Sequence, residues 1–262
     1  MQYNILFFYT SAFFYLIGTV LYLLFVSKKQ PVFFTYSKQW LIVALTAGFF
    51  YLIIRYREQG HLPMVSLFEI TYFYAWLLSA VYIIFIKENT GKIIQGLAFL
   101  LFDIILIYDL TLDKTIQPLN PLLKSFWLGI HVPAIILSYS AFGISFAISV
   151  YSIIAEKRGK DTKGLQPLNS GLIIFGVILL FFGIATGSIW AHTAWGTYWN
   201  WDPKETWALI TLIIYALAVI LEKAFKLKHF WLSVISVVGF LAMLTTFFGV
   251  SLFMVSHHAY QQ

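Results

Sequence analysis

Eight apolar segments, each close to the length of a membrane-spanning helix, recur along the chain. They cover residues 4–26, 39–56, 66–86, 93–112, 125–155, 170–191, 206–222 and 230–256. A transmembrane helix needs about 20 mostly apolar residues. Only 11% of the residues are charged, whereas a soluble domain carries about 25%. The sequence therefore predicts an all-α polytopic membrane protein, a single transmembrane helical domain over residues 1–262 with the lipid bilayer as its solvent.

The charge and the cysteine content limit the function. The net charge of +6 does not indicate a nucleic-acid partner, because membrane proteins keep Lys and Arg in their cytoplasmic loops. The chain has no cysteine, so it has neither a thiolate metal site nor a cysteine nucleophile of its own. The first apolar run, Ile5–Val26, lacks a basic leader and a small-residue cleavage site, which favours a retained helix over a signal peptide.

The distribution of basic residues predicts how the spans are oriented. One set of loops carries 12 of the 17 Lys and Arg residues and the other set carries 5. The richer set is expected in the cytoplasm. Both termini, the segment 190–207, His61 and the pair His257 and His258 then lie outside, and His229 lies at the cytoplasmic end of the last span. The inverted topology is the alternative.

An unusual density of tryptophan marks residues 190–207, where five of 18 residues are Trp. One interpretation is an aromatic belt, since Trp anchors helix ends at the lipid headgroups. Belts, however, are spread around a protein rather than concentrated in one loop. The other interpretation is a flat platform of Trp195, Trp199 and Trp201, whose indole faces stack on a large planar ring such as a porphyrin.

The end of this segment has the pattern of a helix start. Asp202 is placed as the N-cap, Pro203 at the first helical position and Glu205 at the third, which is a capping-box pattern. Asp202 and Glu205 therefore have a structural interpretation, which is to fix the start of the seventh span. This role is compatible with ligand binding, because a fixed helix start also fixes the loop before it.

The same segment resembles the WWD signature of haem-handling membrane proteins. Its matching residues read Trp195-Gly-x-x-Trp199-x-Trp201-Asp202-Pro203-Lys204-Glu205. The Pro-Lys-Glu continuation resembles the CcsA/ResC branch of cytochrome c biogenesis proteins rather than the CcmC branch, which diverges after the aspartate. Other stretches that resemble the CcsA branch are Gly60-His61-Leu62-Pro63 with Glu69, His131-Val132 with Ser138-Tyr139, and Gly249-Val250 leading to His257-His258-Ala259-Tyr260. The resemblance covers most of the chain from about residue 55 onward.

The resemblance implies that haem b binds at an outer WWD loop within residues 190–207. Haem iron takes axial imidazoles, and the external haem ligands of the family match His131 and His258. Alone, His131 is also interpretable as a helix-packing residue and His258 as a solvated tail residue. His257 is the rival of His258, because adjacent helical residues point about 100° apart. The site that the resemblance implies also contains Trp195, Trp199, Trp201 and Asp202.

The remaining histidines have separate interpretations. CcsA-like chains usually carry a histidine of a second, intramembrane haem site where this chain has Ile220. His229 either replaces that ligand or is an ordinary interfacial histidine. His192 stands where the family often has Asn and is expected to be a packing or supporting residue. His61 lies in an outer loop, and the sequence shows no partner for it.

Three cations on the expected outer side are candidates for pairing with haem propionates. They are Arg55, Arg57 and Lys204, and Lys204 has the best position because it follows the Trp-rich loop directly. The alternative for each is simple anchoring at the membrane interface.

The function that the resemblance implies is haem handling in a membrane cytochrome c synthase. The outer loop would present haem for thioether attachment to the Cys-x-x-Cys-His segment of an apocytochrome c, with a separate CcsB/ResB-type membrane partner. The expected location is a bacterial cytoplasmic membrane or a thylakoid-type membrane. Whether the chain is itself an enzyme stays open. The alternatives are a haem exporter or chaperone without ligation activity, a small-solute transporter and a regulator of haem biosynthesis.

Overall fold

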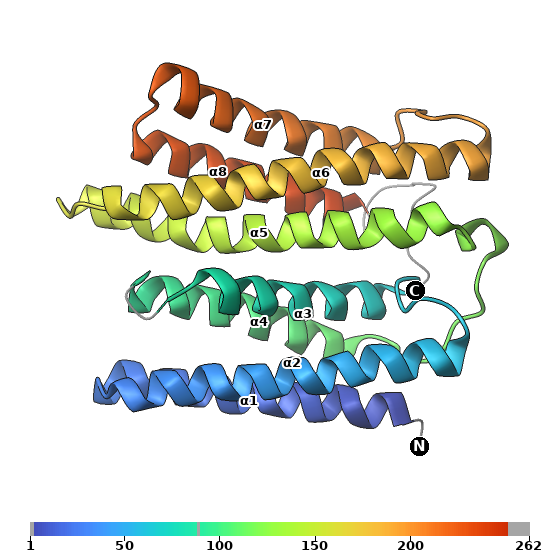
Figure 1. Cartoon of the computed structure of the whole chain (residues 1–262), viewed down its shortest axis with the longest axis horizontal. Coiled ribbons are helices and arrows are strands. Elements are labelled where there is room, and N and C mark those ends of the chain that lie inside the picture. The colour runs from blue at the N-terminus through green and yellow to red at the C-terminus, as the bar shows by residue number, and fades with distance from the viewer. Residues whose placement is uncertain (1–2, 88–89, 251–262) are drawn as a thin grey trace. The chain divides into compact units, whose positions relative to one another are not determined.

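The structure is a computed structural model that describes residues 3–87 and 90–250, and eight long helices account for most of that part (Figure 1). In chain order they are α1 (Tyr3–Lys28), α2 (Pro31–Gln59), α3 (Leu67–Phe85), α4 (Lys92–Thr111), α5 (Phe126–Lys157), α6 (Gln166–Trp195), α7 (Pro203–Phe225) and α8 (His229–Leu244). All eight are long and apolar enough to cross a membrane, the last of them together with the helical turn that continues it to Gly249. The prediction of an all-α, multi-pass membrane protein is confirmed, whereas the side of the termini stays a prediction.

α2 and α6 extend well beyond the apolar runs that predicted them. α2 begins at Pro31 rather than at residue 39, and proline at the first helical position is favourable because its missing N–H has no partner there anyway. Lys38 interrupts the apolar run but not the helix, since its ammonium donates to the carbonyl of Ile86 and lies over the ring of Tyr82. α6 continues to Trp195, where Gly196 ends it in the left-handed conformation.

The chain forms two compact units, which divide between Leu119 and Asn120. Unit 1 contains α1 to α4, with α1 packed along α2 and α3 packed against α4. Unit 2 contains α5 to α8, with α5 packed against α6 and α8, and α7 packed against α6 and α8. The expectation of one domain over residues 1–262 stays a prediction.

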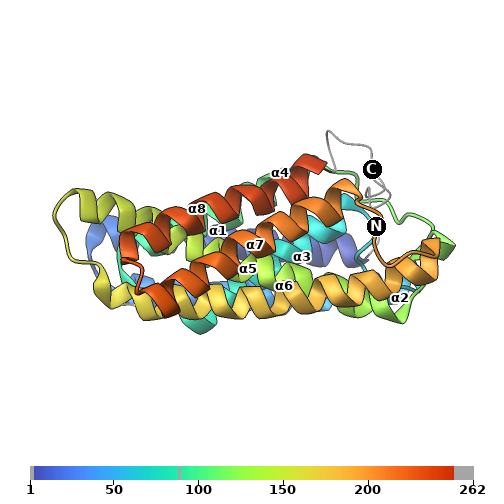
Figure 2. The same ribbon diagram turned by 90° about the horizontal axis from the view of Figure 1, so that it is seen from above.

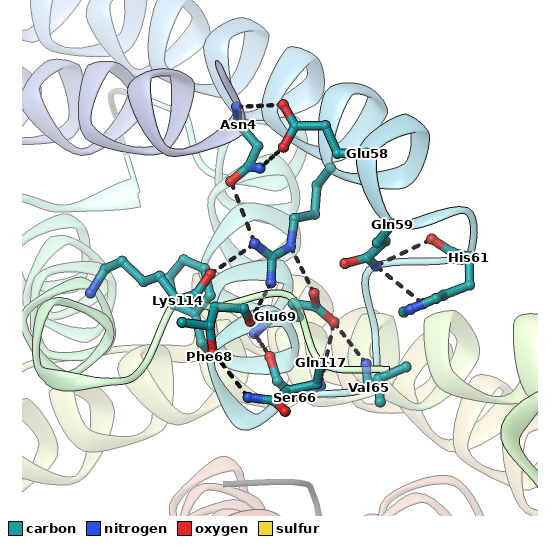
Figure 3. A network of polar contacts seen from close by, with 12 residues as sticks. Asn4, Glu58, Gln59, His61, Val65, Ser66, Phe68, Glu69, Lys114 and Gln117 are labelled. Atoms are coloured by element: carbon teal, nitrogen blue, oxygen red, sulfur yellow. Dashed lines mark hydrogen bonds and ion pairs between the residues drawn. The ribbon is translucent and has the colours of Figure 1, made fainter. Parts of the chain in front are cut away.

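Unit 1 is held at one end by a buried arginine. The guanidinium of Arg55 is fully buried, and its Nε donates to Glu69 at 2.9 Å. Its Nη atoms donate to the side chain of Asn4 and to the carbonyls of Lys114 and Thr115. Figure 3 shows Asn4, Glu69 and Lys114 in this network. One side chain of α2 therefore joins α1, α3 and the segment that follows α4.

Unit 2 depends on three glycines that let α5 approach α6 closely. A Cβ atom at Gly176, Gly183 or Gly187 would lie within 2.6 Å of Phe142, Ile135 or His131 respectively. The pair Gly183 and Gly187 is a G-x-x-x-G motif, which brings membrane helices into close contact. The α5–α6 and α7–α8 connections lie at one end of this unit, and the α6–α7 connection lies at the other (Figure 2).

Candidate functional site

A cavity of about 100 Å³ lies beside the α6–α7 connection, and we name it the loop pocket. Its lining comes from α5, α6, the Trp-rich loop, α7 and the short π-helical segment η4 (Thr245–Gly249) that continues α8. The side chains that matter for chemistry are His131, Tyr139, Tyr198, Trp199 and Lys204. The loop pocket thus brings together an imidazole, an ammonium and aromatic rings from separate parts of unit 2.

His131 is held in one protonation form by α6. Its Nδ1 lies 2.6 Å from the carbonyl oxygen of Gly183. A carbonyl only accepts hydrogen bonds, so Nδ1 must carry the proton, and the lone pair of the neutral ring is on Nε2. Metal-ligating histidines are typically oriented in this way, with the other ring nitrogen donating to a carbonyl or carboxylate. The geometry of His131 is therefore that of a preoriented nitrogen ligand.

The three tryptophans of the expected platform do not lie in one plane. Trp195 is the last residue of α6, and its ring meets Trp190 edge-on at a centroid distance of 5.3 Å and 75°. The rings of Trp199 and Trp201 are 5.8 Å apart and perpendicular, at 89°. Only Trp199 of the three lines the loop pocket. A flat three-indole platform is thus not the arrangement of this structure, and of these three tryptophans only Trp199 contributes to the cavity.

Trp201 has an unusual backbone. Its φ is +59°, a left-handed conformation that costs a non-glycine residue roughly 1–2 kcal/mol. Its side chain is 70% exposed. A large aromatic residue that is both strained and exposed gains little from packing against the rest of the described protein, so internal packing does not explain why tryptophan stands here.

The loop before Trp201 is fastened to α6. Ser188 Oγ donates to the carbonyl of Tyr198 at 2.8 Å, and the ring of Tyr198 stacks on His192 at 4.2 Å and 15°. His192 thus supports the position of the loop, in agreement with the packing role expected from the sequence. The contact holds Tyr198 beside Trp199 at the rim of the loop pocket.

The predicted capping box at the start of α7 is confirmed. The Asp202 carboxylate accepts from the backbone N–H of Lys204 at 2.9 Å. The Glu205 carboxylate accepts from the N–H groups of Asp202 and Asn200 at 3.3 and 3.0 Å. Asp202 is buried, and its carboxylate serves to hold the start of α7 in place. Lys204 and Glu205, in the first turn of α7 that this capping box fixes, both line the loop pocket.

The three candidate cations have different surroundings. Lys204 lines the loop pocket. Arg55, in contrast, is fully buried and forms an ion pair with Glu69, which leaves its guanidinium unavailable to a propionate. The guanidinium is already used to join helices of unit 1. Arg57 is exposed in the last turn of α2 and does not line the loop pocket.

The remaining predicted ligands do not join this pocket within the described residues. His257 and His258 lie outside the residues that the structure describes. His229 is buried at the start of α8, where its Nε2 lies 3.1 Å from Ser152 Oγ, and it lines a different cavity at the other end of unit 2. His61 belongs to unit 1, where its Nδ1 lies 3.2 Å from Gln59 Nε2 (Figure 3).

Two features of the site were missed by sequence reasoning. Gly183 and Gly187 position His131, and the G-x-x-x-G spacing was the signal that could have identified them. Thr246 and Phe247 of η4 line the pocket, and Phe247 meets the ring of Tyr139 edge-on at 6.0 Å. No sequence pattern distinguishes these two residues from ordinary residues of an apolar span.

The side chains of the loop pocket suit haem in kind. An imidazole with its lone pair on Nε2 suits an axial position on iron, Trp199 and Tyr198 offer ring faces, and Lys204 is a cation for a propionate. Pockets that enclose a drug-sized ligand measure about 300–1,000 Å³. The volume of about 100 Å³ therefore accommodates an edge of the macrocycle rather than the whole of it.

Comparison with known sequences identifies the family. A sequence model of the family described as "Cytochrome C assembly protein" matches residues 64–258. The chain belongs to this family. The matched range contains the whole loop pocket, the capping box and all of α3 to α8. The resemblance to CcsA-type proteins is thereby confirmed.

Individual relatives agree with this assignment. The chain is 32% identical to protein NrfI of Wolinella succinogenes, over 85% of this chain and 26% of NrfI. It is 32% identical to the cytochrome c biogenesis protein CcsA of Chlamydomonas reinhardtii, over 80% of this chain and 64% of that protein. CcsA of Cyanophora paradoxa is 28% identical over 95% of each chain. The chain thus spans about a quarter of NrfI and less than two thirds of the Chlamydomonas protein.

A solved structure shares the fold. The cytochrome c haem lyase CcmF superposes with a TM-score of 0.75 at 14% identity, over 97% of this chain and 47% of CcmF. At this identity the likeness establishes the helical fold alone. The chain is thus a multi-pass membrane protein of the cytochrome c assembly family with a CcmF-like arrangement of helices.

Proposed function

We propose that this chain is the haem-handling subunit of a membrane cytochrome c synthase, which presents haem b at the WWD loop (residues 190–207) on the outer side of the membrane. The observation that carries the proposal is the position of His131 in the loop pocket, beside Trp199 and Lys204, with Nδ1 fixed on the Gly183 carbonyl. Membership of the cytochrome c assembly family supports haem as the substrate.

Each residue of the proposed site has a distinct role. His131 ligates the iron on one side and His258 on the other, with His257 as the rival of His258. Trp199 contacts the macrocycle, and Lys204 pairs with a propionate. Trp195, Trp201 and Asp202 complete the site, the first two as aromatic neighbours and Asp202 as the residue that fixes the loop.

The chemistry of the product defines what the protein must do. Haem supplies two vinyl groups, to which the thiols of the apocytochrome's Cys-x-x-Cys-His segment add to form thioether bonds. The chain has no cysteine, so its own residues only hold and orient the substrate. Orientation of this kind lowers a barrier by up to about 7–11 kcal/mol in the best intramolecular systems. The proposal includes a CcsB/ResB-type membrane partner, as the resemblance implies.

The absorption spectrum of the purified protein tests the ligand assignment. We expect a haem absorption band in the unaltered protein, its loss in His131→Gly, and its return when imidazole is added to that variant. His61→Asn is the matched control, because it removes a histidine of unit 1 that does not line the loop pocket. An unchanged spectrum in His131→Gly contradicts the proposal, as does equal loss in both variants.

Coexpression with an apocytochrome separates a synthase from a haem exporter or chaperone. The chain would be expressed with its CcsB/ResB-type partner and with an apocytochrome that carries Cys-x-x-Cys-His. Covalent haem on the apocytochrome, reduced in His131→Ala and in His258→Ala, is the expected result. Haem delivered without a covalent bond would instead assign the exporter or chaperone function.

A further inference from the structure

A second cavity, of about 910 Å³, lies at the end of unit 2 opposite the loop pocket, and we name it the lysine pocket. It is formed where α5 is joined to α6 and α7 is joined to α8 (Figure 2). Five lysines and three carboxylates line it, namely Lys160, Lys163, Lys223, Lys226, Lys228, Glu156, Asp161 and Glu222. The proposed haem site uses none of these residues.

Each carboxylate of the lysine pocket already accepts hydrogen bonds from the protein. Glu222 Oε1 accepts from Gln166 Nε2 at 2.9 Å and from Ser170 Oγ, while its Oε2 lies 3.9 Å from Lys223 Nζ and has no hydrogen-bond partner among the described residues. Glu156 accepts from the hydroxyl of Thr162, and Asp161 accepts from the backbone N–H of Lys163 at 2.9 Å. These bonds fix the negative groups against the helices and the connection between α5 and α6.

The lysines, in contrast, are mostly unpaired. Lys223 lies 3.9 Å from Glu222. The other four have no ion pair to any residue in the part of the chain that the structure describes, and all four are exposed. The lysine pocket therefore has an excess of positive charge that no described side chain neutralises.

His229 is an independent indication of a ligand. Its side chain is only 5% exposed, it lines the lysine pocket, and its Nδ1 has no hydrogen-bond partner among the described residues. Nε2 is within hydrogen-bond distance of Ser152 Oγ. A buried polar atom without a partner destabilises the folded protein, so a group in the pocket that forms a hydrogen bond with Nδ1 would be favourable.

The surroundings indicate where such a group comes from. The lysine pocket lies at the ends of four membrane-spanning helices, and Phe225 and Trp231 beside it are exposed, at 73% and 54%. Exposed aromatic residues next to basic residues are typical of the lipid headgroup level. The excess of Lys and Arg on this side also predicts that it faces the cytoplasmic leaflet, which carries the anionic lipids.

We propose that the lysine pocket binds the phosphate headgroup of an anionic phospholipid, with Lys163, Lys226 and Lys228 around the phosphate and His229 at its edge. The acyl chains lie against the apolar helix surfaces that bear Phe225 and Trp231. A zwitterionic lipid binds more weakly, because its own ammonium opposes the lysines. This site is separate from the proposed haem site and does not depend on it.

Titration of the purified full chain with short-chain lipids tests this proposal. Native mass spectrometry and thermal unfolding would be followed with phosphatidylglycerol, phosphatidylcholine and inorganic phosphate. We expect a one-to-one complex and a higher Tm with phosphatidylglycerol only. An equal response to phosphatidylcholine, or to inorganic phosphate at the same concentration, would overturn the assignment to an anionic lipid.

Two variants locate the site. Each lysine near an anionic lipid strengthens binding roughly fivefold, so the triple variant Lys163→Gln/Lys226→Gln/Lys228→Gln should bind on the order of 100-fold more weakly. The matched control is Lys28→Gln/Lys29→Gln/Lys87→Gln, which removes three exposed lysines of unit 1. Equal loss in the two triple variants overturns the proposal.

A further variant tests whether the buried imidazole of His229 contacts the lipid phosphate. His229→Phe keeps a ring in place but removes Nδ1, and about a tenfold weaker complex is expected because a hydrogen bond to a charged group is lost. Unchanged lipid affinity in this variant would exclude His229 from the site and so overturn the proposal as stated. The lysine variants decide the matter if His229→Phe does not fold.

Discussion

His131 Nδ1 donates a hydrogen bond of 2.6 Å to the carbonyl of Gly183. One helical turn later, Gly187 lies so close to the same imidazole that a Cβ atom there would be 2.5 Å from Nδ1. The Gly183 carbonyl also accepts a hydrogen bond from Thr186 Oγ1 at 3.0 Å. The ring reaches it because neither Gly183 nor Gly187 has a side chain. The contact surface of two helices therefore fixes both the position and the tautomer of the proposed iron ligand.

The substitution Gly187→Ala tests this relationship. Its Cβ would lie 2.5 Å from Nδ1 and 2.6 Å from Cε1 of His131, so the ring must move. We expect a loss of haem absorbance comparable to that of His131→Ala, together with about 1–3 kcal/mol of destabilisation from overpacking. Haem occupancy and thermal unfolding of the purified protein are the measurements.

The control for this prediction is Gly171→Ala in the same helix. A Cβ at Gly171 meets no described atom within 4 Å, so only the higher helix propensity of alanine acts there. Unchanged haem occupancy is expected in this variant. Normal occupancy in Gly187→Ala as well would show that the α5–α6 contact does not position the ligand.

Two substitutions of Asp202 distinguish its role as a helix cap from any role of its negative charge. Asp202→Ala removes the acceptor for the Lys204 N–H, and the loss of an N-cap costs about 0.5–2 kcal/mol. Asp202→Asn removes the charge but keeps a good cap. If Asp202 acts by fixing the helix start, haem occupancy falls in Asp202→Ala and is retained in Asp202→Asn. Loss in both variants would instead assign a role to the negative charge.

A substitution of Trp201 tests whether this residue serves the reaction or stabilises the fold. At a φ of +59°, Trp201→Gly relieves the left-handed backbone strain and removes a side chain that is 70% exposed. We expect a Tm equal to or above that of the unaltered protein, and lower yields of holocytochrome c in coexpression. A lower Tm together with a normal yield would indicate that Trp201 stabilises the loop and does not serve the reaction.

The sequence predicted the features that depend on local pattern. The eight spans follow from apolar length, and the capping box follows from the spacing of Asp202 and Glu205, because both are set by residues close in sequence. The start of α2 was predicted too late, because Lys38 was placed in the loop before the span. In the structure Lys38 lies within the helix, and its ammonium donates a hydrogen bond to the buried carbonyl of Ile86.

Features that depend on residues far apart were less predictable. No spacing rule anticipates the angle of 89° between the rings of Trp199 and Trp201, or the positive φ of Trp201. The pairing of Arg55 with Glu69 joins α2 to α3 and left that cation unavailable for a propionate. The family resemblance supplied His131, but its tautomer became assignable only when α6 was placed beside it.

The Arg55–Glu69 pair gives a stability prediction for unit 1. Glu69 also closes a capping box with Ser66 and accepts from the N–H of Val65 at 3.0 Å, so its carboxylate fixes both the arginine and the start of α3. Removal of one partner of a buried ion pair leaves an uncompensated charge, which costs about 3–5 kcal/mol. Glutamine at position 69 has the same shape and preserves the capping box.

We therefore expect Arg55→Met to lower the Tm of the purified protein strongly, and Arg55→Met/Glu69→Gln to recover part of the loss because no unpaired carboxylate remains. Arg57→Met is the matched control, since Arg57 follows Arg55 by two residues on α2, is exposed, and should lower the Tm little when it is removed. A double variant as unstable as Arg55→Met would mean that the hydrogen bonds to Asn4, Lys114 and Thr115, rather than the ion pair, hold this end of unit 1 together.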